Sequence, residues 1–331
     1  MSTSTSKFNQ AQWLSATPLE MYEGTYNITS PAAEQLSLQS GLPSIAKGGP
    51  NLGANDGIEV LDLGSGLGQV TQELIKLRSQ GQVEPTRGIR ITAGDIDETF
   101  LDNLRSKQKV EKGWDIVNVE KLDANIDRPN DTILSLASPL LSLLSLLSPS
   151  PLSPLLSLSP LSLSSPLLSS PLLSSCLVSS CLVSSPLPSR DESIRVLKPR
   201  GTLSFSTWAY AGPLHLLQHA IALLPSYPLT PSPPPEGPWT QPEYIRKILI
   251  EHNMKEIKVT PFEFQQYADS PKEMARKMWP VVKIITSQWG ERQGELGWTM
   301  FEKIEELLRR DQGDGRVKII SVALIVTAKK P

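Results

Sequence analysis

Residues 60–68 read Val-Leu-Asp-Leu-Gly-Ser-Gly-Leu-Gly, and they decide the fold class because an apolar run gives way to regularly spaced glycines. The run from Ile58 to Leu63 is typical of a buried strand. Residues 69–79 then carry valine and leucine at helical spacing. A strand, a glycine-rich turn and a helix in succession predict the first part of a βαβ unit.

The same alternation continues along the chain and predicts an α/β fold with a doubly wound, mostly parallel sheet. A separate N-terminal helix is predicted over 31–41. Ser30 would be its N-cap, Pro31 would occupy its first position, and Gly41 would end it. Further strands are expected at 89–95, 115–119, 202–207, 257–262 and 317–327, and further helices at 98–108, 241–252 and 271–310.

The glycines at 64, 66 and 68 carry the chemical information in the first turn. A ligand can approach the backbone closely only where no Cβ intrudes, and glycine also tolerates the necessary turn angles. The glycine spacing is a weak signal by itself. The whole string is stronger, because Asp62 stands two residues before the first glycine.

This string resembles the first motif of class I S-adenosylmethionine-dependent methyltransferases, which has the form acid-x-Gly-x-Gly-x-Gly. The resemblance implies that S-adenosyl-L-methionine is the cofactor and that the loop lies against its methionine and ribose portion. Gly64, Ser65, Gly66 and Gly68 would form that loop, and Asp62 would fix the loop and the cofactor's amino group.

Two later positions extend the resemblance. Asp95 ends the second expected strand, where the family carries an acid that binds both ribose hydroxyls, and Ile96 follows it in the expected site. Asp97 is the alternative ribose ligand, although it could equally cap the next helix. Asp123 and Ala124 follow the third strand and resemble the motif that accepts from the adenine amino group. Ligands of open α/β sheets bind along this edge.

The segment Arg195–Thr202 resembles the helix end that precedes strand five in the family, with Arg200 where glycine is common. The resemblance covers residues 57–127 and 190–212 well. It implies a seven-stranded sheet of the Rossmann-like class I methyltransferase type.

The resemblance also implies features of the later chain. The final strand, 317–327, would enter antiparallel, and 271–310 would form a helical cap. Strand four would lie beside strand one, and the apolar run 131–137 can fill that place.

A tract between Thr132 and Ser189 has no charged residue and consists almost entirely of serine, leucine and proline. Successive pentads begin at Ser164, and their near-perfect repetition suggests expanded repetitive DNA or retained non-coding sequence. Recurring prolines oppose a continuous helix or a central strand. The sequence therefore predicts a low-complexity, poorly ordered insertion at 138–189.

These features divide the chain into an N-terminal segment, 1–56, that could cover a substrate, and a methyltransferase domain, 57–331, interrupted by the insertion. Cys176 and Cys181 belong to the repeat and have no histidine nearby, so we expect no metal site.

Charge and hydropathy restrict the partners. The formal net charge is -2 and the sequence pI is about 6.0, which gives no basic excess for binding nucleic acid. The N-terminal residues lack the apolar core of a secretory signal, and no run reaches the roughly 20 apolar residues of a membrane helix. We expect a cytoplasmic protein that acts on a small-molecule acceptor.

The acceptor side of the site is less well specified, and no catalytic residue can be assigned. His215 and His219 share a helical face after strand five, although helix-surface histidines without a role are commoner. Aromatic residues are further candidates near the acceptor, namely Tyr22, Tyr26, Trp208, Tyr210 and Trp279. Trp208, expected just beyond the strand, is the best of them.

Two alternatives remain open. A nicotinamide-dependent dehydrogenase would need Gly-x-Gly-x-x-Gly, whereas the third glycine here comes one residue early, at Gly68. A catalytically inert, methyltransferase-like protein is the other alternative, because the tract replaces the helix and acceptor loop expected after strand four.

Overall fold

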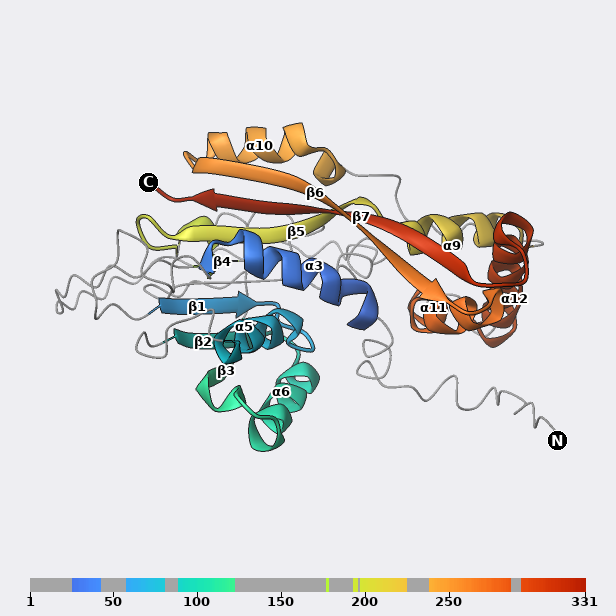
Figure 1. Ribbon diagram of the computed structural model, residues 1–331, viewed down its shortest axis with the longest axis horizontal. Coiled ribbons are helices and arrows are strands. Elements are labelled where there is room, and N and C mark those ends of the chain that lie inside the picture. The colour runs from blue at the N-terminus through green and yellow to red at the C-terminus, as the bar shows by residue number, and fades with distance from the viewer. Residues whose placement is uncertain are drawn as a thin grey trace, which may run out of the picture.

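The computed structural model describes residues 26–42, 58–80, 89–122, 177–178, 193–195, 197–224, 238–286 and 293–331. The helices and strands within these ranges are drawn in Figure 1. In chain order they are α3 (Tyr26–Gln39), β1 (Ile58–Leu63), α5 (Gln69–Ser79), β2 (Ile89–Asp95), α6 (Glu98–Val110), η1 (Trp114–Ile116), β3 (Val117–Lys121), β4 (Leu177–Val178), β5 (Thr202–Tyr210), α9 (Gly212–Ala222), η2 (Pro238–Thr240), α10 (Pro242–Glu251), β6 (Lys255–Ala268), α11 (Pro271–Thr286), α12 (Gln293–Gln312) and β7 (Val317–Lys329).

The strands form one sheet in the order β3-β2-β1-β4-β5-β7-β6. The pairs from β3 to β5 are parallel, and β7 runs antiparallel to both β5 and β6. The predicted α/β class is confirmed. Because β1, β2 and β5 are parallel, their carboxyl ends meet at one edge, where the glycine-rich loop, α6 and α9 begin.

Helices cover both faces of the antiparallel half of the sheet. Successive side chains of a strand point to opposite faces. On β7, Ala323 and Ile325 pack in the cluster that contains α3 residues, whereas Leu324 and Val326 pack with residues of α10. The N-terminal helix and α10 therefore lie on opposite sides of this half, as Figure 1 shows.

The N-terminal helix begins earlier than predicted. It starts at Tyr26, so Pro31 lies inside the helix and not at its first position, and Ser30 is not the N-cap. Pro31 has no N–H to donate to the carbonyl one turn earlier. Burial compensates for that lost bond, because Ala32, Ala33 and Leu36 are at most 3% exposed.

The strand between β1 and β5 also differs from the prediction. The segment 131–137 was expected there and lies outside the described residues. Leu177 pairs instead with Val60 on one side and Thr202 on the other. These residues belong to the serine, leucine and proline tract, within its longest stretch free of proline, 172–185. A central strand needs backbone N–H groups on both sides, which explains why it uses that stretch.

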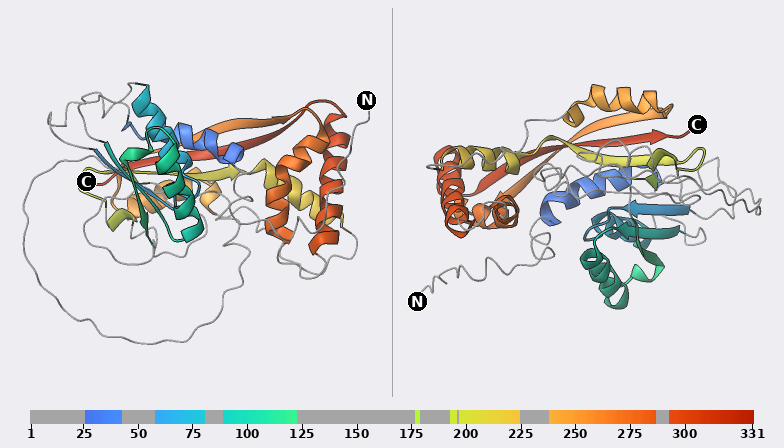
Figure 2. Two further views of the ribbon diagram at one scale, coloured as in Figure 1. Left: turned by 90° about the horizontal axis from the view of Figure 1, so that it is seen from below. Right: turned by 180° about the vertical axis from the view of Figure 1, so that it is seen from behind.

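The later strands are longer than their apolar runs suggested. β6 and β7 pair along most of their lengths, from Lys255 opposite Lys329 to Ala268 opposite Val317. Figures 1 and 2 show α9, α11 and α12 gathered at one end of this long pair. The single helical segment expected at 271–310 is two helices, which pack through a buried cluster that includes Met278, Val282, Met300 and Ile304.

Candidate functional site

The glycine-rich loop after β1 has left-handed backbone angles at all its glycines. The φ angle is 70° at Gly64, 51° at Gly66 and 75° at Gly68. The loop rests on the end of β2, because the N–H groups of Gly64 and Ser65 donate to the Gly94 carbonyl at 2.8 and 2.9 Å. These angles suit glycine, since a Cβ is disfavoured there.

Two of the glycines face different surroundings. A Cβ added at Gly66 would meet no described atom within 4 Å, so the backbone there is open to an approaching ligand. A Cβ at Gly68 would lie 2.7 Å from Trp114 and 2.8 Å from Leu104. The conformation of Gly68 is therefore also required by packing of the loop against α6 and η1.

Asp62 acts on the helix that follows the loop. Its side chain is fully buried, and Oδ2 accepts from the backbone N–H of Thr71 at 3.2 Å and from its hydroxyl at 2.7 Å. The carboxylate thus fixes the first turn of α5 relative to β1. The contact shown is with α5, so the roles of Asp62 toward the loop and the cofactor's amino group stay predictions.

Asp95 joins the two strand ends. Its Oδ2 accepts from the Gly66 N–H at 2.8 Å, its Oδ1 accepts from the Asp97 N–H at 3.0 Å, and the residue is 2% exposed. Burial raises the pKa of this carboxyl, and the bonds from the backbone N–H groups of Asp97, Gly66 and Ile96 oppose that rise. The structure therefore places the expected ribose ligand directly beside the open backbone of the loop.

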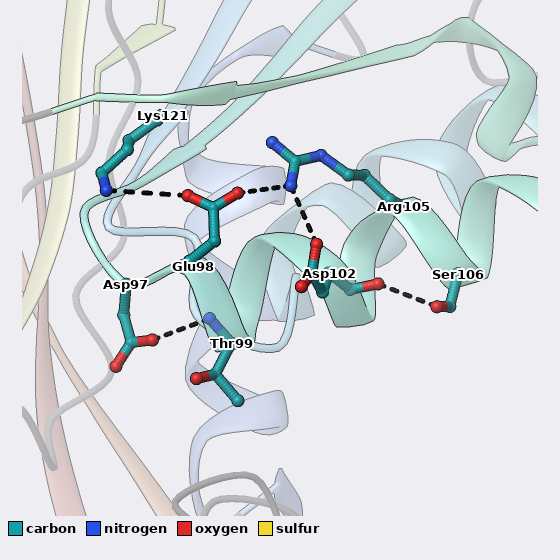
Figure 3. Close-up of polar contacts among 7 residues, drawn as sticks. All are labelled: Asp97, Glu98, Thr99, Asp102, Arg105, Ser106 and Lys121. Carbon is teal, nitrogen blue, oxygen red and sulfur yellow. Dashed lines mark hydrogen bonds and ion pairs between the residues drawn. The ribbon is translucent and has the colours of Figure 1, made fainter.

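Asp97, the alternative ribose ligand, has a structural partner. It is the N-cap of α6, and its carboxylate accepts from the Thr99 N–H at 2.8 Å, as Figure 3 shows. Glu98 beside it is 2.5 Å from Arg105 and 3.6 Å from Lys121. The start of α6 is thus tied to the end of β3 by residues on the exposed side of the strand edge.

The other expected cofactor residues divide into those that the structure describes and those that it does not. Ile96 is 53% exposed, although it is apolar and lies next to buried Asp95. It can cover an apolar ring at this edge of the sheet. Asp123 and Ala124 lie outside the described residues, so their adenine-binding role stays a prediction.

The acceptor candidates are distributed over the sheet. Trp208 lies within β5, not beyond it, and packs against Phe264 with ring centroids 5.7 Å apart. His215 stacks on Tyr210, with ring centroids 4.4 Å apart and an interplanar angle of 14°. Tyr26 begins α3, and its side chain is not among those described. The Tyr210–His215 pair therefore lies nearest the carboxyl end of β5.

Side chains that the sequence analysis did not identify also contact the glycine-rich loop and the start of α5. The ammonium group of Lys107 donates to the Leu67 carbonyl at 2.8 Å and lies 5.3 Å from the ring centroid of Trp114. Gln69 donates to the Thr29 hydroxyl of α3 at 3.1 Å. No sequence pattern marks these contacts, because each joins residues about 40 positions apart.

Solved structures that are similar to this chain include several methyltransferases. The chain is similar to a Haemonchus contortus N-methyltransferase solved with phosphomonomethylethanolamine and S-adenosylhomocysteine, at 14% identity over 87% of this chain and 51% of that chain, with a TM-score of 0.38. It is also similar to a putative methyltransferase from Bacillus halodurans, at 13% identity over 88% of this chain and 97% of that chain, with a TM-score of 0.42.

A third similar structure is the geranyl diphosphate C-methyltransferase of Streptomyces coelicolor A3(2), at 12% identity over 89% of this chain and 80% of that chain, with a TM-score of 0.35. No family model matches the chain. All three TM-scores are below 0.5.

The described ranges contain no group of three or more histidine, cysteine, aspartate or glutamate residues placed to hold a metal ion. No helix in the part of the chain that the structure describes has both the length and the apolar character needed to cross a bilayer.

Proposed function

We propose that this chain is a class I methyltransferase that binds S-adenosyl-L-methionine at the carboxyl edge of β1 and β2 and transfers its methyl group to a small-molecule acceptor. The observation that carries the proposal is the pairing of Asp95 with Gly66, a buried carboxylate beside a backbone surface with no side chain. The order of the strands and the antiparallel β7 support the same family.

The donor set at this edge fits an adenosyl group. Each oxygen of the Asp95 carboxylate has more than one acceptor position, so it can receive ribose hydroxyls while it keeps its bonds to Gly66 and Asp97. The exposed side chain of Ile96 supplies an apolar surface for a purine ring. Asp123 and Ala124 would contact the adenine from the next strand, as the family resemblance implies.

The bound cofactor would supply an activated sulfonium methyl group, and the chain's own residues would bind and orient. Gly94 at the end of β2 holds the glycine-rich loop through its carbonyl, and Asp62 of β1 holds the first turn of α5 through Thr71. A base is needed only when the acceptor must lose a proton. His215, stacked on Tyr210 after β5, is the residue we place nearest the acceptor.

The choice of a small-molecule acceptor is supported by charge. A formal net charge of -2 provides little attraction for the phosphates of nucleic acid. Figures 1 and 2 show α9, α11 and α12 at one end of the long β6–β7 pair, and Leu67 of the glycine-rich loop packs in the same buried cluster as residues of these helices. Helices packed beside the loop favour a small acceptor over an extended polymer.

Calorimetry with S-adenosylhomocysteine tests the cofactor half of the proposal. We expect one site in the wild-type chain, and binding weakened about tenfold or more by Asp95→Asn, because a neutral amide accepts ribose hydroxyls less strongly. Asp97→Asn is the matched control, since asparagine is also a good N-cap and the change lies only two residues away. Equal loss in both variants, or no binding to the folded wild-type chain, would contradict the proposal.

A screen of acceptor classes with methyl-labelled cofactor tests the transfer itself. Cofactor binding with transfer to a small molecule supports an active enzyme. Binding with no transfer to any class tested would favour the inert alternative.

A further inference from the structure

A cavity of about 360 Å³ lies between α3 and α5, away from the glycine-rich loop. Its wall is formed by the later turns of both helices, and it shares no residue with the cofactor site proposed above. The lining residues are Glu34, Ser37, Leu38, Glu73, Lys76, Leu77 and Gln80.

Two acids of the wall differ in their partners. Glu73 is 9% exposed and pairs with Lys76 at 2.6 Å, so its charge is already compensated. Glu34 is exposed and has no ion pair with any described residue. Two glutamates and one lysine give the wall a formal charge of -1, and that charge resides on Glu34.

A buried hydroxyl and an apolar surface complete the wall. Ser37 is 1% exposed, and its Oγ has no hydrogen-bond partner among the residues that the structure describes. A buried polar group without a partner is unfavourable, so a ligand that donates a hydrogen bond there would stabilise the chain. Leu38 is 41% exposed although it is apolar, and buried Leu77 lies on the other helix.

The ends of the helices favour a cation in this position. The residues in the wall lie toward the carboxyl termini of α3 and α5, where the helix dipole gives a partial negative charge. The last turn of α5 contains Lys76 and Arg78, which compensate for that charge, whereas the last turn of α3 contains no basic residue.

We propose that this pocket binds a small organic monocation, namely a primary ammonium group on a short apolar stem. The ammonium group donates to the carboxylate of Glu34 and to the Oγ of Ser37, and the stem lies against Leu38 and Leu77. A bound ligand holds α3 against α5, and the Thr29–Gln69 hydrogen bond joins the same two helices near the glycine-rich loop.

Titration calorimetry with n-butylamine tests this proposal on the full chain without any cofactor. Butyrate and n-butanol serve as the anionic and neutral probes of matched size. We expect saturable binding of butylammonium at one site, a rise in melting temperature, and no saturable binding of butyrate or butanol. Butyrate binding as tightly as butylammonium, or no binding of butylammonium at concentrations on the order of 10 mM, would overturn the proposal.

Substitutions locate the site. Glu34→Gln keeps the shape of an exposed side chain and should weaken butylammonium binding about tenfold or more. Glu111→Gln removes the same charge from an exposed position at the end of α6 and should leave the affinity unchanged. Ser37→Ala should weaken binding a few-fold and raise the melting temperature of the ligand-free chain. Equal affinities in wild type, Glu34→Gln and Glu111→Gln would place the binding elsewhere.

Discussion

The carboxylate of Asp95 accepts a hydrogen bond from the backbone N–H of Gly66 at 2.8 Å, so the end of β2 holds the loop that follows β1. Asp95 and Gly66 are 29 positions apart in the sequence, yet they form one surface. In it, a buried carboxylate lies beside a backbone segment that no side chain covers. The arrangement keeps a carboxylate in a place where burial disfavours its charge. The buried carboxylate therefore lowers the free energy of unfolding at a position where a ligand can be bound.

The destabilising effect of the buried Asp95 carboxylate should depend on pH. Burial raises the pKa of Asp95 above 3.8 in the folded chain, so the folded chain binds more protons than the unfolded chain above that pH. The contribution of the group to stability is therefore lost as the pH rises through the folded-state pKa. Asp95→Asn cannot titrate, and its free energy of unfolding should improve relative to wild type between about pH 4 and about pH 7.

Urea unfolding of both chains at the two pH values measures this difference, and subtraction removes the effects of other acids. A difference that stays constant with pH, or one that moves in favour of wild type, would contradict the raised pKa.

Substitutions at Gly66 and Gly68 should separate the effect of the loop on ligand binding from its effect on packing. Gly68→Ala introduces a left-handed alanine 2.7 Å from Trp114, and we expect a loss of about 2–4 kcal/mol in the free energy of unfolding. Gly66→Ala has the backbone strain without the clash, so it should lose only about 1–2 kcal/mol. Affinity for S-adenosylhomocysteine should nevertheless fall at least about tenfold in Gly66→Ala.

Chemical denaturation and calorimetry on the two variants provide the test. An unchanged affinity in folded Gly66→Ala would mean that the ligand does not approach this backbone.

The position of the central strand β4 within the repeat can be tested by substitution. Val178 pairs with Leu61 and Leu203, and proline there removes a backbone N–H from the middle of the sheet. We expect Val178→Pro to lower the free energy of unfolding by about 2–3 kcal/mol. Val183→Pro is the matched control, because Val183 occupies the same position in the next, identical pentad. Equal effects of the two substitutions, measured by urea unfolding, would show that the strand is not uniquely Leu177–Val178.

The end of the chain holds the turn before β5. The ammonium group of Lys330 donates to the carbonyl oxygens of Ile194, Arg195 and Leu197 at 2.8, 2.9 and 2.7 Å. Because the side chain is partly exposed, Lys330→Met should destabilise the chain by only about 1–2 kcal/mol.

Lys329→Met is the neighbouring control, since its partner Glu256 is exposed and a surface pair contributes at most about 1 kcal/mol. Thermal unfolding of both variants measures the difference. A larger loss in Lys329→Met than in Lys330→Met would contradict the role of the three carbonyl contacts.

The first βαβ unit could be predicted from the sequence almost to the residue. The bounds of β1, α5 and β2 follow from an apolar run, spaced glycines and helical periodicity, all of which are local. The cap role of Asp97 is also within reach of the sequence, because an acid just before a helix is a local signal.

Other features depend on contacts that the sequence does not encode locally. A tract of near-identical pentads does not specify which of its residues enters the sheet, so Leu177–Val178 could not be distinguished. The length of β6 comes from pairing with β7, not from the apolar run at 257–262. The bond between Asp95 and Gly66 likewise joins two separate strands, although the motifs placed both residues at one edge.

Photo-cross-linking of labelled S-adenosyl-L-methionine, followed by peptide mapping, tests the central claim most directly. We predict that the label attaches to peptides that contain residues 62–68 or 95–97, and that excess S-adenosylhomocysteine prevents the attachment. Label found only in other peptides, or label that excess S-adenosylhomocysteine does not displace, would contradict a cofactor site formed by Gly66 and Asp95.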